Sequence, residues 1–190
     1  MRLFKKKAKK LQRDELHDIP VGSMVELSDT TTFALEEKTS QTYEMKEYKK
    51  YEGNGFLRYM YHLVSSDDEA ILGVDVNSAL GEYSLARFVI DSEEEFSDPL
   101  GDTIVMDFDN PENEGETVSV EYVRKSITNT NLIIVTSEGR EEYEDVEIQD
   151  YLADDDTLLM VELWDSIFTF FLGESIETAS VNVYPMAEKE

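Results

Sequence analysis

Short apolar or alternating runs fill the chain after residue 20, and acidic or glycine-containing segments separate them. Runs of this length, bounded by turn-forming residues, are typical of β-strands. No segment after residue 20 shows a sustained 3.6-residue apolar period, which an amphipathic helix would require. The pattern predicts strands at residues 23–27, 31–35, 41–48, 56–64, 70–76, 83–90, 103–108, 117–123, 132–136, 146–151, 158–164, 168–172 and 180–184.

So many short strands with regular turns predict a mainly β fold of antiparallel packed sheets or small barrels. The sequence DEAILGVDV at 68–76 lines up with DDTLLMVEL at 155–163. This echo favours two related β lobes, although two acidic hairpins can resemble each other without a shared origin. The acidic, proline-containing segment at 92–101 is the expected seam. We therefore expect a basic tail at 1–18, a first lobe at 19–95 and a second lobe at 96–190.

The first 18 residues have a different composition, with no glycine or proline, and predict a short helix. Pro20 ends it, because the residue before a proline avoids the α conformation. On a helical wheel the apolar side chains fall within an arc of about 140°, with the basic residues on the rest except Lys7, which falls within the arc and could extend its charge out of it. Such a helix lies in the interface of an anionic membrane. The expected membrane-binding residues are Arg2, Leu3, Phe4, Lys5, Lys6, Lys7, Lys9, Lys10, Leu11 and Arg13.

Charge is divided unevenly along the chain. The net charge is −26, yet seven of the 17 basic residues lie within residues 1–13, where there is no acid. The rest of the chain would repel nucleic-acid phosphate and anionic lipid, so only the tail is expected to approach a membrane, and no nucleic-acid partner is expected. Three other interpretations of the tail remain open, namely a solubilising terminus, a segment folded onto the acidic body, or a nucleic-acid contact. Adaptation to a salty cytoplasm would also explain the acidity.

The chain offers little equipment for catalysis. It has no cysteine and only two histidines, His17 and His62, and no nucleotide-binding or nucleophile motif accompanies them. Pro111 interrupts the one acidic loop that begins like a calcium-binding loop. We expect a protein that is not an enzyme, with no catalytic residue, no metal and no cofactor. A hydrolase or metal-dependent enzyme would need buried acids gathered around His62 in a cleft.

The most apolar predicted hairpin contains the one tryptophan and the sequence FTFF at 168–171. Packing in the core is one interpretation of these side chains. The other is an exposed face that recruits a protein partner, which would use Trp164, Phe168 and Phe170.

Three segments carry a resemblance to a known family. They are IPVGS at 19–23, RYMYHL at 58–63, and the run at 158–164 followed by FLGE at 171–174. Their order resembles an uncharacterised family of prokaryotic β-rich domains of unknown function, over residues 19–185. Genes for such domains lie near those for phage-shock-type membrane-stress proteins. The resemblance implies a membrane-stress or interaction context and carries over no catalytic residue.

Together these features predict a cytoplasmic, non-catalytic adaptor, peripheral to the inner face of the membrane through its basic N-terminal segment. It would take part in a membrane-stress response with a protein partner that the sequence does not identify. The alternative is an acidic decoy that mimics DNA and binds a basic protein. A mimic needs carboxylates in ordered rows, whereas here they concentrate in predicted turns.

Overall fold

Eleven antiparallel strands form one continuous sheet in the computed structural model, which describes residues 15–28, 40–53, 55–77, 79–95, 98–110, 113 and 115–186. The strands of the first half are β1 Met24–Ser28, β2 Ser40–Gly53, β3 Phe56–Val64, β4 Glu69–Asn77 and β5 Glu82–Glu95. Those of the second half are β6 Thr103–Asp109, β7 Thr117–Val135, β8 Arg140–Ala153, β9 Leu158–Trp164, β10 Ile167–Ile176 and β11 Val181–Tyr184. A single 3₁₀ turn, Thr178–Ser180, precedes β11.

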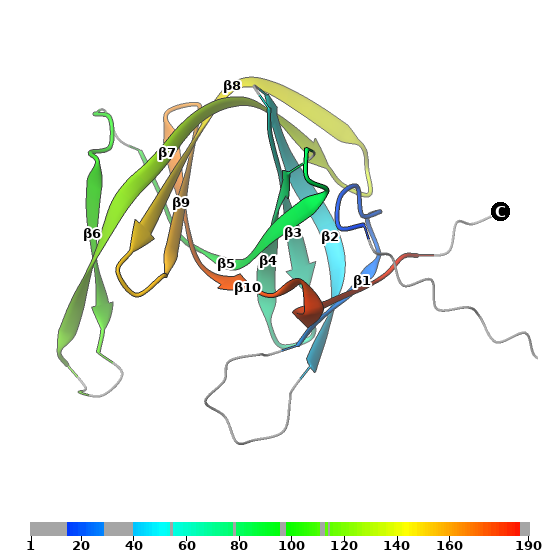
Figure 1. Cartoon of the computed structure of the whole chain (residues 1–190), viewed down its shortest axis with the longest axis horizontal. Helices are drawn as coiled ribbons and strands as arrows, with labels where there is room; N and C mark the ends of the chain where they lie inside the picture. The colour runs from blue at the N-terminus through cyan, green and yellow to red at the C-terminus, as the bar shows by residue number, and fades with distance from the viewer. Residues whose placement is uncertain are drawn as a thin grey trace, which may run out of the picture.

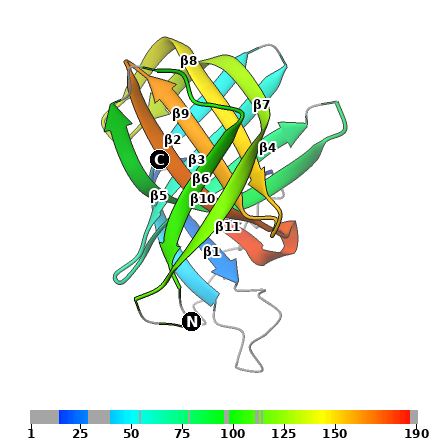
Figure 2. The same ribbon diagram turned by 90° about the vertical axis from the view of Figure 1, so that its left-hand side faces the viewer.

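Eight of the strands close into a ring (Figure 1). Around it the order is β2, β3, β4, β5, β10, β9, β8 and β7, and β7 pairs again with β2, with Tyr48 opposite Val135 and Glu52 opposite Asn131. Strand β2 makes this closure possible because its 14 residues first pair with β1 and then with β7. Figure 2 shows the ring from the side, with β9 and β10 running diagonally across it.

The inside of the ring holds a core to which all eight ring strands contribute. Its buried members are Tyr51, Met60, Ile71, Ala86, Phe88, Leu132, Val146, Ile148, Met160 and Phe171. Only the interior of a closed sheet can bring side chains from all its strands into one cluster. Because successive strand residues point to opposite faces, their immediate neighbours point outward.

Two further clusters cover the outer wall of the ring. On one side β1, β11 and the segment around Leu16 and Ile19 pack over β2 to β5. On the other side β6 and Leu100 pack over β7 to β10. Ring strands with buried residues on both faces therefore read as nearly continuous apolar runs, as in β4, where Ala70 to Val74 are all buried.

The two halves of the chain follow the same path. Strands β1 to β5 and strands β6 to β10 each form a meander, and the halves join through the pairs β5–β10 and β2–β7. The echo noted in the sequence falls on β4 and β9, which occupy corresponding places. The mainly β, antiparallel class is confirmed. The two separate lobes are not, because every strand belongs to one sheet.

One strand prediction is wrong. Residues 117–123 and 132–136 were expected to be separate strands, but they are two parts of β7, which has 19 residues. Irregularities between Arg124 and Ser126 and between Thr130 and Leu132 keep the strand paired with β8 across a polar stretch. The strand expected at 31–35 and nearly all of the helix expected at 1–18 lie outside the described residues, and the described residues 15–18 are not helical.

Candidate binding cavity inside the strand ring

A cavity of about 330 Å³ lies inside the ring, among residues from β3, β4, β5, β7, β8, β9 and β10. Its polar side chains include Arg58, Asp75, Asp150, Ser84, Ser126, Ser175 and Lys125. Its apolar side chains include Ala86, Phe88, Leu158 and Met160. Ligand sites commonly have a volume of this order and combine an apolar lining with a few convergent polar groups.

Arg58 is the central polar residue of the cavity. It lies on the inward face of β3 and is only 8% exposed. Its Nη2 donates a hydrogen bond to Asp75 Oδ2 at 2.8 Å, and its Nη1 donates to Asp150 Oδ1 at 2.6 Å. One guanidinium thus links β3 to β4 and, across the ring, to β8. Burial by itself would lower the pKa of Arg58, but the hydrogen bonds and charges of the two carboxylates outweigh it and raise that pKa.

The two carboxylates keep contact with solvent. The side chain of Asp75 is 42% exposed and that of Asp150 is 28% exposed. Ser126 Oγ donates a hydrogen bond to Asp150 Oδ2 at 2.9 Å. The carboxylate oxygens of Asp75 and Asp150 therefore have hydrogen-bond acceptor sites left over, and the buried guanidinium of Arg58 holds both carboxylates in place.

Two glycines shape the apolar wall. A Cβ atom on Gly73 would lie 2.7 Å from Phe88 Cε2, and one on Gly173 would lie 2.4 Å from Phe88 Cδ1. Gly73 is on β4 and Gly173 is on β10, the strands that flank Phe88 on β5. The two edges of the Phe88 phenyl ring face the two glycines. The phenyl ring therefore lies along the wall and turns one face to the interior. Glycine inside a strand commonly marks such a close approach.

The mouth of the cavity lies where β4 ends and β5 begins. Ser84, Lys125 and Ser175 are exposed residues that also line the cavity. A second, shallower hollow of about 560 Å³ shares Asp75 and Ser84 with it and extends over Phe56 and Asn77. The cavity is thus continuous with a depression on the surface.

A second polar cluster lies on the inward faces of β2 and β9. Glu162 is only 2% exposed, accepts a hydrogen bond from the Tyr51 hydroxyl, and lies 2.7 Å from Lys49 Nζ. Burial, followed by the charge of Glu162, raises the pKa of Tyr51 well above its ordinary value. Among the described residues no buried side-chain nitrogen or oxygen lacks a hydrogen-bond partner. This cluster is therefore satisfied internally and offers no obvious site for a ligand.

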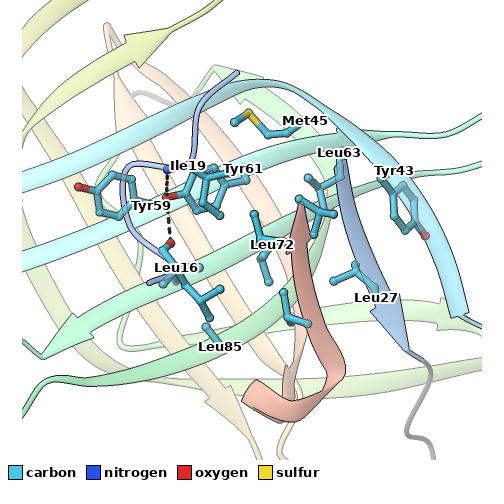
Figure 3. Packing of buried hydrophobic residues seen from close by; sticks show 14 of the residues in the cluster. Leu16, Ile19, Leu27, Tyr43, Met45, Tyr59, Tyr61, Leu63, Leu72 and Leu85 are labelled. Atoms are coloured by element: carbon cyan, nitrogen blue, oxygen red, sulfur yellow. Dashed lines mark hydrogen bonds between the residues drawn. The ribbon is translucent and has the colours of Figure 1, made fainter. Parts of the chain in front are cut away.

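On the outer wall, the segment that follows the tail is fastened by tyrosines (Figure 3). Tyr61 donates a hydrogen bond from its hydroxyl to the carbonyl oxygen of Leu16 at 3.0 Å and accepts one from the backbone N–H of Ile19 at 3.4 Å. Tyr59 donates to Asp18 Oδ1 at 2.9 Å. Leu16 and Ile19 are buried beneath this wall. Residues 15–19 are therefore held at a fixed place on the outer wall.

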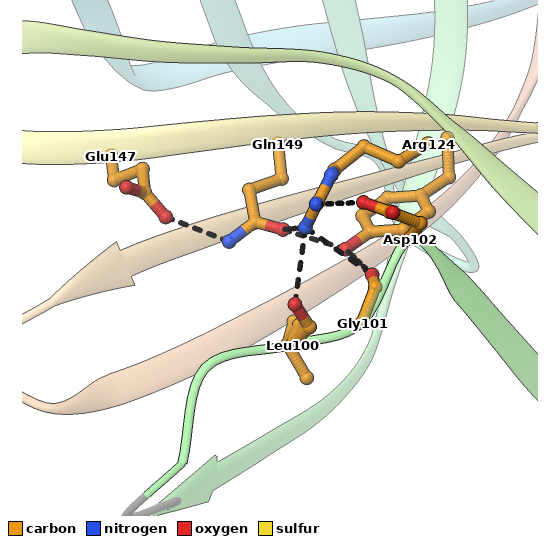
Figure 4. A network of polar contacts seen from close by, with 7 residues as sticks. Leu100, Gly101, Asp102, Arg124, Glu147 and Gln149 are labelled. Carbon is orange, nitrogen blue, oxygen red and sulfur yellow. Dashed lines mark hydrogen bonds and ion pairs between the residues drawn. The ribbon is translucent and has the colours of Figure 1, made fainter.

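A third polar network holds the connection between the two halves (Figure 4). Arg124 on β7 donates hydrogen bonds from Nη1 to the carbonyl oxygens of Leu100 and Gly101 at 3.1 and 3.2 Å, and its Nη2 pairs with Asp102. The hydroxyl of Tyr151 donates to the same Gly101 carbonyl at 3.0 Å. The network positions the segment before β6, so that β6 can fold over the outer wall.

The sequence-predicted residues do not gather at the cavity. Residues 1–13 lie outside the described part of the chain. Phe168 and Phe170 are 3% and 5% exposed in the cluster beneath β6, and Trp164 packs partly buried against Tyr143 at a ring-centroid distance of 4.4 Å. Their role in binding a partner stays a prediction.

The two histidines also lie apart from the residues that line the cavity. His17 Nδ1 is 2.8 Å from the Tyr83 hydroxyl, and His62 Nε2 is 3.5 Å from Glu69 Oε2. Over the described residues no group of histidine and acidic side chains is arranged to hold a metal ion.

Sequence reasoning missed Arg58, Asp75 and Asp150. The available signal was their position, since each is a charged residue on the same strand face as buried residues. Only the closed sheet shows that this face points into the interior and that Asp150 on β8 reaches Arg58 on β3.

Comparison of the chain with models of protein families, with curated proteins and with solved structures finds no match. The resemblance to β-rich domains near phage-shock genes therefore stays a prediction. Within the described residues, no helix has the length and apolar character needed to cross a membrane.

Proposed function

We propose that this protein is a non-catalytic binding domain that holds a small amphipathic molecule inside its strand ring. The observation that carries the proposal is the cavity of about 330 Å³, whose lining combines a fixed polar group at Arg58 with the apolar wall around Phe88. A closed sheet of eight strands has an interior just wide enough to be filled by side chains or to hold one small ligand. Here the lining of the cavity includes the small residues Gly73, Ser84 and Ala86.

The absence of catalysis is part of the proposal, and the position of the histidines supports it. Neither histidine lines the cavity, and the charged side chains of Arg58, Asp75 and Asp150 are paired with one another. A general acid or base must reach the substrate from the site itself. The arrangement favours recognition over reaction.

Titration with 1-octanol, followed by amide chemical shifts in NMR spectra, tests the binding function. We expect shifts at Gly73, Phe88 and Ser126, which surround the cavity. Ser175→Trp places a large side chain at the mouth and should abolish them. Ser137→Trp is the matched control, because Ser137 is exposed in the β7–β8 turn, away from the cavity. Equal shifts in both variants, or no binding to the unmodified chain, would contradict the proposal.

A second function remains a proposal, namely an adaptor peripheral to an anionic membrane through residues 1–13. The fastening of residues 15–19 to the outer wall favours it, because the tail would then hold the acidic body at a defined orientation. Each basic residue near an anionic surface contributes about 1 kcal/mol.

Co-sedimentation with anionic and neutral vesicles tests the adaptor function. Replacing Lys5, Lys6, Lys9 and Lys10 by glutamine in the full chain should abolish binding to anionic vesicles. The control is a variant that carries only Arg140→Gln and keeps Lys46, Lys49, Lys50 and Lys125. It tests the loss of a basic residue from the body. If the tail variant binds as well as the unmodified chain, the tail is not the membrane contact.

A further inference from the structure

We infer that the cavity selects a ligand with a positively charged nitrogen head group and a short apolar body, a primary alkylammonium being the simplest example. The inference rests on the proposed binding function and names the class of ligand. Three observations support it, namely the hydrogen-bonding capacity of the ion cluster, the charge around it, and the shape of the apolar wall.

The ion cluster has more acceptors to offer than donors. Arg58 uses its Nε and Nη2 on Asp75 and its Nη1 on Asp150, with a further Nη2 contact to Asp150 at 3.4 Å. A guanidinium has five N–H groups, so at most one is left by these contacts. Two carboxylates have about eight lone-pair sites, of which these contacts and the Ser126 hydroxyl occupy about five. A head group that donates hydrogen bonds therefore fits, and an ammonium group has three such donors.

Charge favours the same choice. Two carboxylates face one buried guanidinium, and Lys125, the other basic residue of the lining, is exposed at the mouth. The net charge of the chain is −26, and a cleft within an acidic protein concentrates cations and repels anions. A carboxylate or phosphate ligand would have to displace Asp75 or Asp150 from Arg58. An ammonium group would instead join the carboxylates from their solvent side.

The apolar wall sets the length of the body. Phe88 turns its face to the cavity between Gly73 and Gly173, and Leu158 and Met160 line the cavity from β9. An engineered core cavity of about 150 Å³ holds benzene, so a cavity of about 330 Å³ accepts an apolar group roughly twice as large. A chain of about eight carbons with a one-atom head is of this size.

Three probes of equal length separate the ligand class from the binding function. They are n-octylammonium, 1-octanol and octanoate. Their binding is measured by isothermal titration calorimetry below their aggregation concentrations, at about 150 mM salt, where the Debye length is about 8 Å. We expect octylammonium to bind about tenfold more tightly than octanol, and octanoate to bind more weakly than octanol. Ser175→Trp should remove binding of all three.

Two variants locate the head group. Asp75→Asn should remove most of the preference for octylammonium over octanol, measured as the ratio of the two affinities in the same variant. Glu121→Gln is the matched control, because it deletes one negative charge from an exposed position on β7 outside the cavity. Lys125→Gln removes a positive charge from the exposed mouth without touching the ion cluster, and should raise octylammonium affinity several-fold. This variant keeps the test decisive if Asp75→Asn does not fold.

The outcomes separate an error in the ligand class from an error in the binding function. Octanoate or octanol binding at least as tightly as octylammonium, with loss of binding in Ser175→Trp, would overturn the ligand class and keep the binding function. Octylammonium binding that Ser175→Trp does not reduce would show adsorption to the acidic surface and overturn both. Binding of none of the three probes would overturn the binding function itself.

Discussion

At the scale of single residues, two glycines without side chains shape the interior of the strand ring as much as the side chains of Phe88 and Arg58 do. Gly73 and Gly173 have no side chain, and the ring of Phe88 occupies the space that their Cβ atoms would need. The phenyl group therefore lies along the wall and leaves the centre of that end open. Arg58 lies on β3, separated from Phe88 by β4, and is held by two carboxylates. Glycine and arginine, both unusual within a buried strand, together define the cavity.

Gly73→Ala tests this role of glycine. The new Cβ would lie 2.7 Å from Phe88 Cε2, so the phenyl ring must move toward the cavity. We expect a loss of about 1–3 kcal/mol in the free energy of unfolding, measured by urea denaturation. Gly139→Ala is the control, because nothing lies within 4 Å of its added Cβ. Combining Gly73→Ala with Phe88→Leu should recover part of the loss, and a loss that persists unchanged would show that the ring is not the obstacle.

At the scale of elements, hairpins and irregular strands decide the shape. The β9–β10 turn consists of Asp165 and Ser166, whose φ values of 51° and 67° are those of a tight hairpin turn with matching twist. Strand β7 bends at two irregularities and can pair with β8 and β2 in the ring and with β6 outside it. Between β5 and β6 the described residues 98–102 have no regular structure, and Arg124 holds them by binding the carbonyl oxygens of Leu100 and Gly101.

Arg124→Gln tests whether that network positions the connection. We expect faster hydrogen exchange at the amides of residues 100–104, while the free energy of unfolding changes little because Asp102 is exposed to solvent. Arg140→Gln, which breaks a pair exposed on both sides, should leave exchange at these amides unchanged. Unaltered exchange in Arg124→Gln would mean that β6 alone holds the connection.

At the scale of the whole molecule, tyrosines join the parts of the fold that are distant in sequence. Tyr43 on β2 donates to Asp68, and burial followed by this hydrogen bond raises its pKa to about 12. Burial is also the main cause that raises the pKa of Tyr51, Tyr59 and Tyr61. Each of these hydroxyls is neutral in the folded protein above the pH at which it ionises in the unfolded chain. These tyrosines therefore keep their protons only while the fold that buries them, including the segment at residues 15–19, is intact.

Stability should fall steeply in alkali. Between pH 10 and pH 12 the unfolded chain loses tyrosine protons that the folded protein retains, so each such residue lowers the free energy of unfolding by about 1.4 kcal/mol per pH unit. Below pH 10 these residues contribute their full effect. Urea denaturation from pH 8 to pH 11.5, with tyrosine ionisation followed at 295 nm, measures the slope. Tyr61→Phe should reduce the slope by one residue's share, and an identical slope would rule out Tyr61 as a source.

The strand segments were predictable because their causes are local. Residues 56–64 and 158–164 match β3 and β9, since apolar runs between turn residues leave few other conformations. The long strand β7 was not predictable, because its middle is polar and is held by partners on β8 rather than by its own composition. Arg58 and Asp75 looked like ordinary strand residues, and only the closure of the sheet brings Asp150 on β8 to Arg58 as a second partner.

By itself the sequence determined the antiparallel β class, the position of most strands and the division between a basic tail and an acidic body, because each depends on neighbouring residues or on composition. Tertiary structure alone decided that the two halves share one sheet, that this sheet closes, and which face of each strand points inward. Closure depends on pairing between β2 and β7, residues about 80 apart, whose preference for each other no local pattern records. The cavity exists only as a consequence of that closure.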